Sequence, residues 1–210
     1  TFLLRWFTPV VEVPLCGHAT LASAHLLYEE GIVPGDQPAE FETLSGRLSA
    51  QKTSAGIEMD FPLQPVASVA DAHVPDALRK GLGVPLVEVA ADENRYVVEL
   101  CDAETLRNLQ PNLALLATLG RGVVVTCRSE NREFDFISRN FLPHRGIPED
   151  PVTGASHCSL ADFWRPKLKR EAFIAYQSSR RGGTVGVRII GGRVTLTGKA
   201  VTVLRGTIDG

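Results

Sequence analysis

Two short segments of the 210-residue chain combine a glycine with a residue that handles protons. In the segment CGHAT, His18 follows Gly17, and in the segment EDPVTGASH, Asp150 stands four residues before Gly154. An unperturbed imidazole titrates at about pH 6.5, so His18 can transfer a proton near neutral pH. A carboxylate such as Asp150 can orient a substrate or share a proton. His18 and Asp150 are therefore the candidate catalytic residues, and the chemistry is acid/base proton transfer.

The glycines in these segments also predict an anion-binding site. A glycine at a helix start leaves backbone N–H groups that can face a ligand, and the helix dipole adds about 0.3–1 kcal/mol for an anion. Two such helix starts facing one cleft would hold a carboxylate. The candidate substrate-binding residues are Gly17, Ala19, Gly154, Ala155 and Ser156.

Each of these residues also has a purely structural interpretation. A histidine at a helix start is commonly a cap or a packed ring, and an isolated aspartate commonly caps a helix or forms a turn. A lone glycine commonly serves helix initiation or close packing. The occurrence of the pattern twice favours ligand binding for the pair, and we expect the neighbouring Glu149 to face solvent.

Short strands and one helix for each segment must position these residues. Apolar residues recur at helical spacing from Leu21 to Tyr28, and Gly31 ends the run. A second helix is expected to follow Gly154. Stretches such as GVVVTC and FDFISRNFLP have the composition of strands, the first of them buried. The chain is therefore predicted to be α+β, with strands predominating and one central helix in each half.

The two segments lie inside a longer repeat. LRWFTPVVEVPLCGHATLASAHLL can be laid on ISRNFLPHRGIPEDPVTGASHCSLADFW as strand, proline, irregular loop, glycine and helix. Internal duplication of this kind predicts two similar lobes related by a pseudo-twofold axis. The boundary is expected in the proline-bearing stretch near residue 65, which gives an N-terminal lobe over 1–64 and a C-terminal lobe over 65–210. The last strand is a candidate to return to the first lobe.

Composition excludes several classes of protein. A net charge of −2 argues against a general nucleic-acid binder, which needs a basic face. No apolar run approaches the ~18 residues of a membrane span, so we expect a cytoplasmic protein without a membrane partner. The four scattered cysteines show no metal-type pairing, and no metal or cofactor is predicted; they are Cys16, Cys101, Cys127 and Cys158.

The two long motifs, followed by GKAVTVLRGTI near the C-terminus, resemble the PhzF-like isomerase family of phenazine biosynthesis, including its phenazine biosynthesis-like domain-containing proteins. The resemblance covers essentially the whole chain. It implies a two-lobed diaminopimelate-epimerase-like fold, each lobe a mostly antiparallel, barrel-like sheet around a central helix, with the active site between the lobes. It also implies cofactor-independent isomerisation of a small carboxylic acid, and often a homodimer. The family's histidine falls on His18 and its aspartate on Asp150.

The chain departs from the family pattern in two places. The family continues its second motif as GSA, whereas this chain has Gly154, Ala155 and Ser156; a one-residue shift turns a helical side chain by about 100°, so Ser156 does not simply replace the missing hydroxyl. The family's proton-abstracting glutamate belongs to a segment upstream of Thr1. A general base typically contributes about 10²- to 10⁴-fold in rate. We therefore expect the 210 residues alone to be impaired, with a less stable first lobe.

Two alternatives to an active PhzF-like isomerase remain open. The first is a catalytically impaired member of the family that acts as a binding or scaffold protein. The second is a thiol-dependent amino-acid racemase or epimerase, because related folds place a cysteine before each of these glycines. Cys16 fits the first position, but Thr153 occupies the second, and its hydroxyl is a far weaker acid than a thiol.

Overall fold

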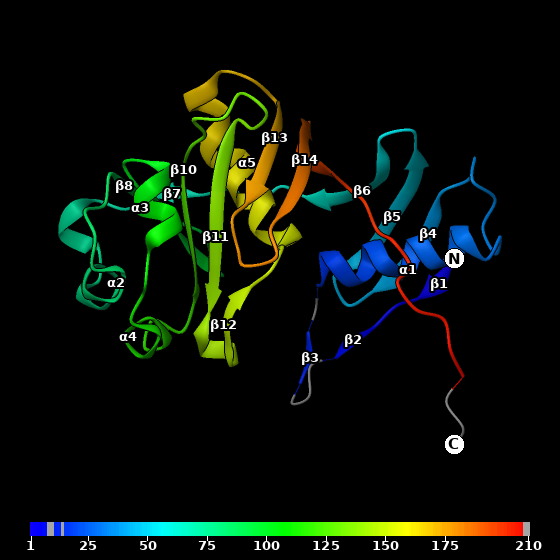
Figure 1. Ribbon diagram of the computed structural model, residues 1–210, viewed down its shortest axis with the longest axis horizontal. Helices are drawn as coiled ribbons and strands as arrows, with labels where there is room; N and C mark the ends of the chain where they lie inside the picture. The colour runs from blue at the N-terminus through cyan, green and yellow to red at the C-terminus, as the bar shows by residue number, and fades with distance from the viewer. Residues whose placement is uncertain (8–10, 14, 208–210) are drawn as a thin grey trace. The chain divides into compact units, whose positions relative to one another are not determined.

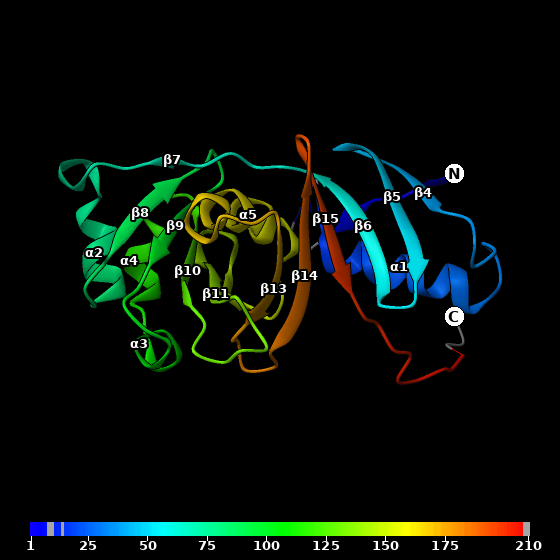
Figure 2. The ribbon, with the colours of Figure 1, turned by 90° about the horizontal axis from the view of Figure 1, so that it is seen from above.

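The computed structural model describes residues 1–7, 11–13 and 15–207. The chain divides into two compact units, Thr1–Asp60 with Thr197–Gly210, and Phe61–Leu196. The chain thus passes from the first unit to the second inside one strand and returns inside another. Figures 1 and 2 show a mixed fold in which strands predominate and helices are few, as the sequence predicted.

The first unit is a small sheet with one helix. Its elements in chain order are β1 (Phe2–Leu3), β2 (Trp6–Phe7), β3 (Glu12–Val13), α1 (Gly17–Glu29), β4 (Ala39–Thr43), β5 (Gly46–Thr53) and β6 (Gly56–Pro62). Strands β4, β5 and β6 form an antiparallel meander, and β1 adds to β4 in parallel. Burial alternates along β4, β5 and β6, which is the period of a strand with one covered face. Trp6 in β2 is also buried.

Helix α1 is buried along one face, through Gly17, Thr20, Ala24 and Tyr28. Tyr28 fixes this face to the sheet: its hydroxyl donates to the Ala50 carbonyl at 2.7 Å and to the Gln37 carbonyl at 3.0 Å. The same hydroxyl accepts a bond from the Ala39 amide at 3.1 Å. The opposite face is more open, with Leu26 exposed.

The second unit is a larger sheet with several helices. Its elements in chain order are β7 (Ala67–Ser68), the 3₁₀ turn η1 (Asp71–His73), α2 (Asp76–Leu82), β8 (Glu88–Ala91), β9 (Arg95–Glu99), α3 (Ala103–Asn108), α4 (Leu113–Ala117), β10 (Gly122–Arg128), β11 (Phe136–Leu142), the 3₁₀ turn η2 (Pro143–Arg145), β12 (Ile147–Asp150), α5 (Gly154–Leu168), β13 (Ala172–Gln177), β14 (Gly183–Ile190) and β15 (Arg193–Gly198). The strand order is β15-β14-β13-β11-β10-β9-β8-β7, and β12 pairs with β11. Most neighbours are antiparallel, but β9 with β10 and β11 with β13 run parallel.

Both faces of the central strands of this sheet are covered. The strand β10, predicted from GVVVTC, is buried from Gly122 to Cys127, and only its last residue, Arg128, is exposed. On one face, α2, α3 and α4 supply leucines to a core that includes Val123 and Val125. On the other face lies α5, which Figure 2 shows surrounded by β9, β10, β11, β13 and β14. A strand covered on both sides reads as a continuous apolar run rather than an alternating one.

Helix α5 is buried on nearly every side. Its buried residues form an unbroken run from Ser156 to Ala161, followed by Phe163 and Trp164. Trp164 stacks on Phe136 with ring centroids 5.6 Å apart, and its indole N–H donates to the Thr126 hydroxyl at 3.0 Å. The centre of the second unit is therefore a helix with no solvent-facing stripe along its first two turns.

Among the described helices of the chain, none has the length and apolar character needed to cross a membrane.

Candidate functional site

The second glycine-led segment forms the start of α5. Strand β12 pairs with β11 so that Asp150 lies opposite Asn140, and Asp150 is buried, with 8% of its surface exposed. The chain then turns through Pro151, and Thr153 takes the N-cap position with φ −116° and ψ 100°. No side chain caps the helix start, and its first turn carries no acidic residue. The positive end of the helix dipole is therefore not neutralised by the helix itself.

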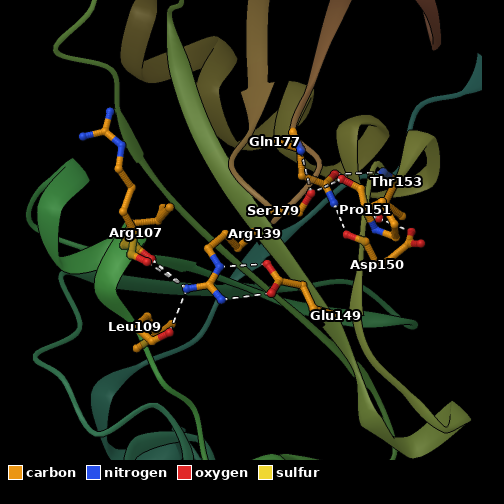
Figure 3. A network of polar contacts seen from close by, with 11 residues as sticks. Arg107, Leu109, Arg139, Glu149, Asp150, Pro151, Thr153, Gln177 and Ser179 are labelled. Carbon is orange, nitrogen blue, oxygen red and sulfur yellow. Dashed lines mark hydrogen bonds and ion pairs between the residues drawn. The ribbon is translucent and has the colours of Figure 1, made fainter.

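A network of side chains holds Asp150 at this helix start (Figure 3). The Thr153 hydroxyl donates to Asp150 Oδ2 and accepts bonds from Asn140 Nδ2 at 2.9 Å and Gln177 Nε2 at 3.3 Å. Gln177 also donates to the Asp150 carbonyl at 2.6 Å and accepts from the Thr153 amide at 2.8 Å. The carboxylate and the helix cap are thus fixed in place by residues from two other strands, Asn140 of β11 and Gln177 of β13, before any substrate arrives.

The loop between Asp150 and Thr153 is also packed from outside. The Ser179 hydroxyl donates to the Pro151 carbonyl at 2.7 Å. Val152 lies against Gly183, where a Cβ atom would come within 2.3 Å of Val152 Cγ2. This approach requires a residue without a side chain at Gly183. The loop therefore has one close-packed position against β14.

Glu149 does not face solvent as expected from the sequence. Its carboxylate forms a two-pronged ion pair with Arg139, at 2.8 Å to Nε and 2.9 Å to Nη2. The Arg139 Nη1 group donates to the carbonyls of Leu106 at 3.1 Å and Leu109 at 2.8 Å, at the end of α3 (Figure 3). Arg139 is 8% exposed. Glu149 thus neutralises a buried guanidinium and connects the strand that carries Asp150 to α3.

The residues at the start of α5 differ in how deeply they are buried. Gly154 and Ala155 are half-buried at the helix start. Ser156 is fully buried, and its hydroxyl donates to the Thr153 carbonyl at 2.9 Å. The Ser156 hydroxyl therefore points into the protein and does not contact a substrate. Only the backbone N–H of Ser156 is left to bind one. His157, one residue further on, is also fully buried and lies 2.7 Å from the same carbonyl.

The first glycine-led segment forms the start of α1. Cys16 is the N-cap, with φ −143° and ψ 102°, and here too no side chain caps the helix and the first turn has no acidic residue. The Cys16 carbonyl accepts a bond from the Thr20 hydroxyl at 2.7 Å. The His18 ring is exposed, and its Nε2 lies 3.4 Å from Cys16 Sγ. Ala19 is half-buried behind it.

The predicted site residues thus form two groups, one in each unit. Asp150, Gly154, Ala155 and Ser156 belong to the second unit, and Gly17, His18 and Ala19 to the first. Each group gathers at the start of a helix, as the repeat predicted. The cooperation of His18 with Asp150 stays a prediction.

Sequence reasoning missed the residues that hold Glu149 and Asp150 in place. Arg139 and Asn140 lie within the strand-like stretch FDFISRNFLP, and buried polar residues inside an apolar strand were the available signal. Gln177 is the last residue of β13, and no pattern in the neighbouring sequence marks it as a functional residue. Within residues 1–7, 11–13 and 15–207, no group of three or more His, Cys, Asp or Glu residues is arranged to hold a metal ion.

The fold is similar to that of an epimerase of known structure. A hydroxyproline epimerase of Agrobacterium vitis has a similar fold, with a TM-score of 0.57 at 14% identity over 94% of this chain and 68% of that one. The likeness at this identity concerns the fold alone. It confirms the diaminopimelate-epimerase-like fold expected from the sequence.

The sequence and closer structures define the family. The PhzC-PhzF family, described as phenazine biosynthesis-like protein, matches residues 1–206, and the chain belongs to it. An uncharacterized isomerase of Halalkalibacterium halodurans is 45% identical over 97% of this chain and 77% of its own length. The human phenazine biosynthesis-like domain-containing protein is 40% identical over 99% of this chain and 77% of its own. A PhzF-family structure from Enterococcus faecalis gives a TM-score of 0.86 at 33% identity, covering 94% of this chain and 74% of that one.

Proposed function

We propose that this chain is a PhzF-like isomerase that moves a proton within a small carboxylic acid. The observation that carries this proposal is the buried carboxylate of Asp150, held by Thr153 beside the uncapped start of α5. Membership of the PhzC-PhzF family and the relatives named as isomerases support it. A fixed carboxylate next to a positive helix end suits a substrate that carries both an acid group and an exchangeable proton.

The proposed reaction is balanced without an oxidant or a reductant. A C–H bond next to an unsaturated or carbonyl system breaks, the electron pair moves into that system, and the proton is delivered to another atom of the same molecule. Substrate and product therefore have the same composition. The protein needs one group to accept the proton and one to return it, together with fixed donors for the carboxylate.

The residues divide this work by their chemistry. The N–H groups of Gly154 and Ala155 at the start of α5 bind the substrate carboxylate, and Asp150 orients the reacting part and helps to shuttle its proton. In the first unit, Gly17 and Ala19 present the equivalent backbone, and His18 is the group that takes up and releases a proton near neutral pH. Deleting one proton-transferring group is expected to cost about 10²- to 10⁴-fold in rate.

The thiol-dependent alternative is not favoured. It needs a thiol at both helix caps, but the cap of α5 is Thr153, whose hydroxyl is donated to Asp150. A hydroxyl is also a much weaker acid than a thiol, whose pKa is about 8.5. Alkylation of Cys16 that abolished an otherwise robust racemisation would revive this alternative.

Deuterium exchange tests the proposed function directly. The protein is incubated in deuterated water with a panel of small cyclic hydroxy-amino acids, and mass spectrometry follows deuterium at carbon. Exchange by the 210-residue chain supports an isomerase. No exchange with any substrate, combined with calorimetric binding of one of them, would favour the binding-protein alternative instead.

A further inference from the structure

The Thr153 carbonyl, at the cap of α5, receives two side-chain donors. The Ser156 hydroxyl donates at 2.9 Å, and His157 Nδ1 lies at 2.7 Å. A carbonyl oxygen only accepts hydrogen bonds, so Nδ1 must carry the proton of a neutral His157 ring, and Nε2 has none. The structure therefore fixes the tautomer of this histidine.

The other ring nitrogen of His157, Nε2, does not contribute a hydrogen bond within the described residues. Nε2 is buried and has no hydrogen-bond partner among the described residues. The ring stacks beside Phe136 with centroids 6.4 Å apart, and burial lowers the pKa of His157 to about 4. An apolar residue would fill this place without leaving a buried nitrogen unpaired. What the histidine supplies here is the bond from Nδ1 to the Thr153 carbonyl.

Holding this carbonyl also fixes the next amide. The peptide unit is planar and its C=O and N–H groups point in opposite directions, so the Thr153 carbonyl and the Gly154 N–H turn together. The carbonyl is drawn along α5 toward His157, and the Gly154 N–H is therefore directed out of the helix start. Because Gln177 binds the Thr153 amide as well, the cap is held on both sides of the residue.

The same arrangement recurs at the start of α1 with different chemistry. Thr20 stands four residues after the Cys16 cap, as His157 stands four residues after Thr153. The buried Thr20 hydroxyl donates to the Cys16 carbonyl at 2.7 Å. A threonine does not titrate near neutral pH, so the feature common to both helix starts is the held carbonyl rather than an acid or a base.

We propose that His157 is a positioning residue, which fixes the Thr153–Gly154 peptide so that the Gly154 N–H is directed at the carboxylate of the substrate. Ser156 supplies the second donor to the same carbonyl. The inference rests on the proposed function only in naming a carboxylate as the ligand. The orientation of the Gly154 N–H belongs to the ligand-free protein and is measured there.

Three variants and a control test this role. His157→Asn keeps a donor close to the place of Nδ1, whereas His157→Leu removes it and His157→Gln moves it outward along the side chain. Ser159→Ala is the control, because Ser159 is a buried serine of the same helix whose hydroxyl donates to Asp92 at 2.6 Å instead. The deciding readout is the ¹⁵N–¹H resonance of the Gly154 amide without ligand, followed by titration with benzoate as a small cyclic carboxylate.

We expect His157→Leu and His157→Gln to shift the Gly154 resonance and to weaken benzoate binding about tenfold, the effect of losing one hydrogen bond. His157→Asn should stay within about twofold of the wild type, and Ser159→Ala should change neither readout. With a turned-over substrate, KM should rise more than kcat falls, because carboxylate binding is shared by ground state and transition state. That split distinguishes positioning from general destabilisation.

A Gly154 resonance that is the same in His157→Leu and the wild type would overturn the proposal. If His157→Leu does not fold, His157→Asn and His157→Gln are compared with each other instead. Identical Gly154 resonances in these two variants would then contradict the proposal. Failure of the proposed function looks different. The wild type would exchange deuterium with no substrate of the panel, while the Gly154 resonance would still differ between His157→Leu and the wild type.

Discussion

The starts of α1 and α5 share a backbone and differ in what surrounds it. Both caps, Cys16 and Thr153, have an extended backbone, and neither helix start has a side-chain cap. In both, the cap carbonyl is hydrogen-bonded to the side chain of the residue four positions later, Thr20 or His157. At α5, the cap side chain belongs to a network with a buried carboxylate. At α1, the Cys16 thiol is half-buried and its neighbour His18 is exposed.

This difference separates two tasks that an acid/base site must combine. Groups that orient a substrate act best when they are fixed beforehand, because no reorganisation is then needed during the reaction. A group that exchanges protons must remain accessible. In the proposed function, the fixed carboxylate of Asp150 suits the first task and the exposed ring of His18 suits the second.

The largest effect is expected from Asp150→Asn. The amide cannot take up a proton, and its uncharged oxygen accepts the Thr153 hydroxyl more weakly than a carboxylate does, so the rate of deuterium exchange should fall about 10²- to 10⁴-fold. Asp76→Asn is the control, because that carboxylate is exposed on α2. Exchange by Asp150→Asn at the rate of the control would show that the fixed carboxylate of the second unit takes no part in catalysis.

Glu149→Gln should destabilise the second unit without touching the reacting groups. Removing one partner of a largely buried ion pair leaves the Arg139 guanidinium without its counter-charge, which costs about 3 kcal/mol of unfolding free energy. The exposed Glu104 on α3 provides the control in Glu104→Gln, expected within about 0.5 kcal/mol of the wild type. Urea unfolding measures both. Equal midpoints for the two variants would mean that Glu149 is not needed to hold the strand of Asp150.

The buried His157 makes the stability of the second unit depend on pH. Burial lowers its pKa to about 4, against about 6.5 in the unfolded chain. As pH falls from about 6.5 to about 4, the unfolded chain binds a proton that the folded protein does not, so the unfolding free energy falls by about 3 kcal/mol. Urea titrations at several pH values should show this loss, and His157→Asn should reduce it. An unchanged pH dependence in that variant would assign the effect to other groups.

The smallest structural effect is expected from His18→Asn. Because the His18 ring is exposed, the unfolding free energy should change by less than about 0.5 kcal/mol. Deuterium exchange should nevertheless fall about 10²- to 10⁴-fold, because His18 is the proposed proton-transferring group of the first unit. If urea unfolding shows that His18→Asn lowers the unfolding free energy by more than about 1 kcal/mol, His18 has a structural role. The two helix starts would then no longer differ in this respect.

The parts of the fold that depend on neighbouring residues were predictable from the sequence. The start of α5 follows from Gly154, and the buried strand β10 follows from three consecutive valines. The repeat then pointed to Asp150 and His18 as members of two similar helix starts. These signals act over a few residues, so they survive without coordinates.

The network around Asp150 was not predictable, since it depends on pairing between distant strands. Asn140 meets Asp150 only because β11 pairs with β12, and Gln177 comes from β13, 27 residues further on. Glu149 was expected in solvent for the same reason: its partner Arg139 becomes a neighbour only when the strands pair. The inward turn of the Ser156 hydroxyl depends likewise on the cap geometry of α5.

The two tryptophans of the chain, Trp6 and Trp164, give the two units separate optical signals. Trp6 is 5% exposed in the first unit, and Trp164 is 2% exposed in the second. Since a buried indole emits at shorter wavelength than a hydrated one, replacing either ring with phenylalanine leaves fluorescence that reports on a single unit. The red shift of each emission band in urea would then show whether the units melt together or one after the other.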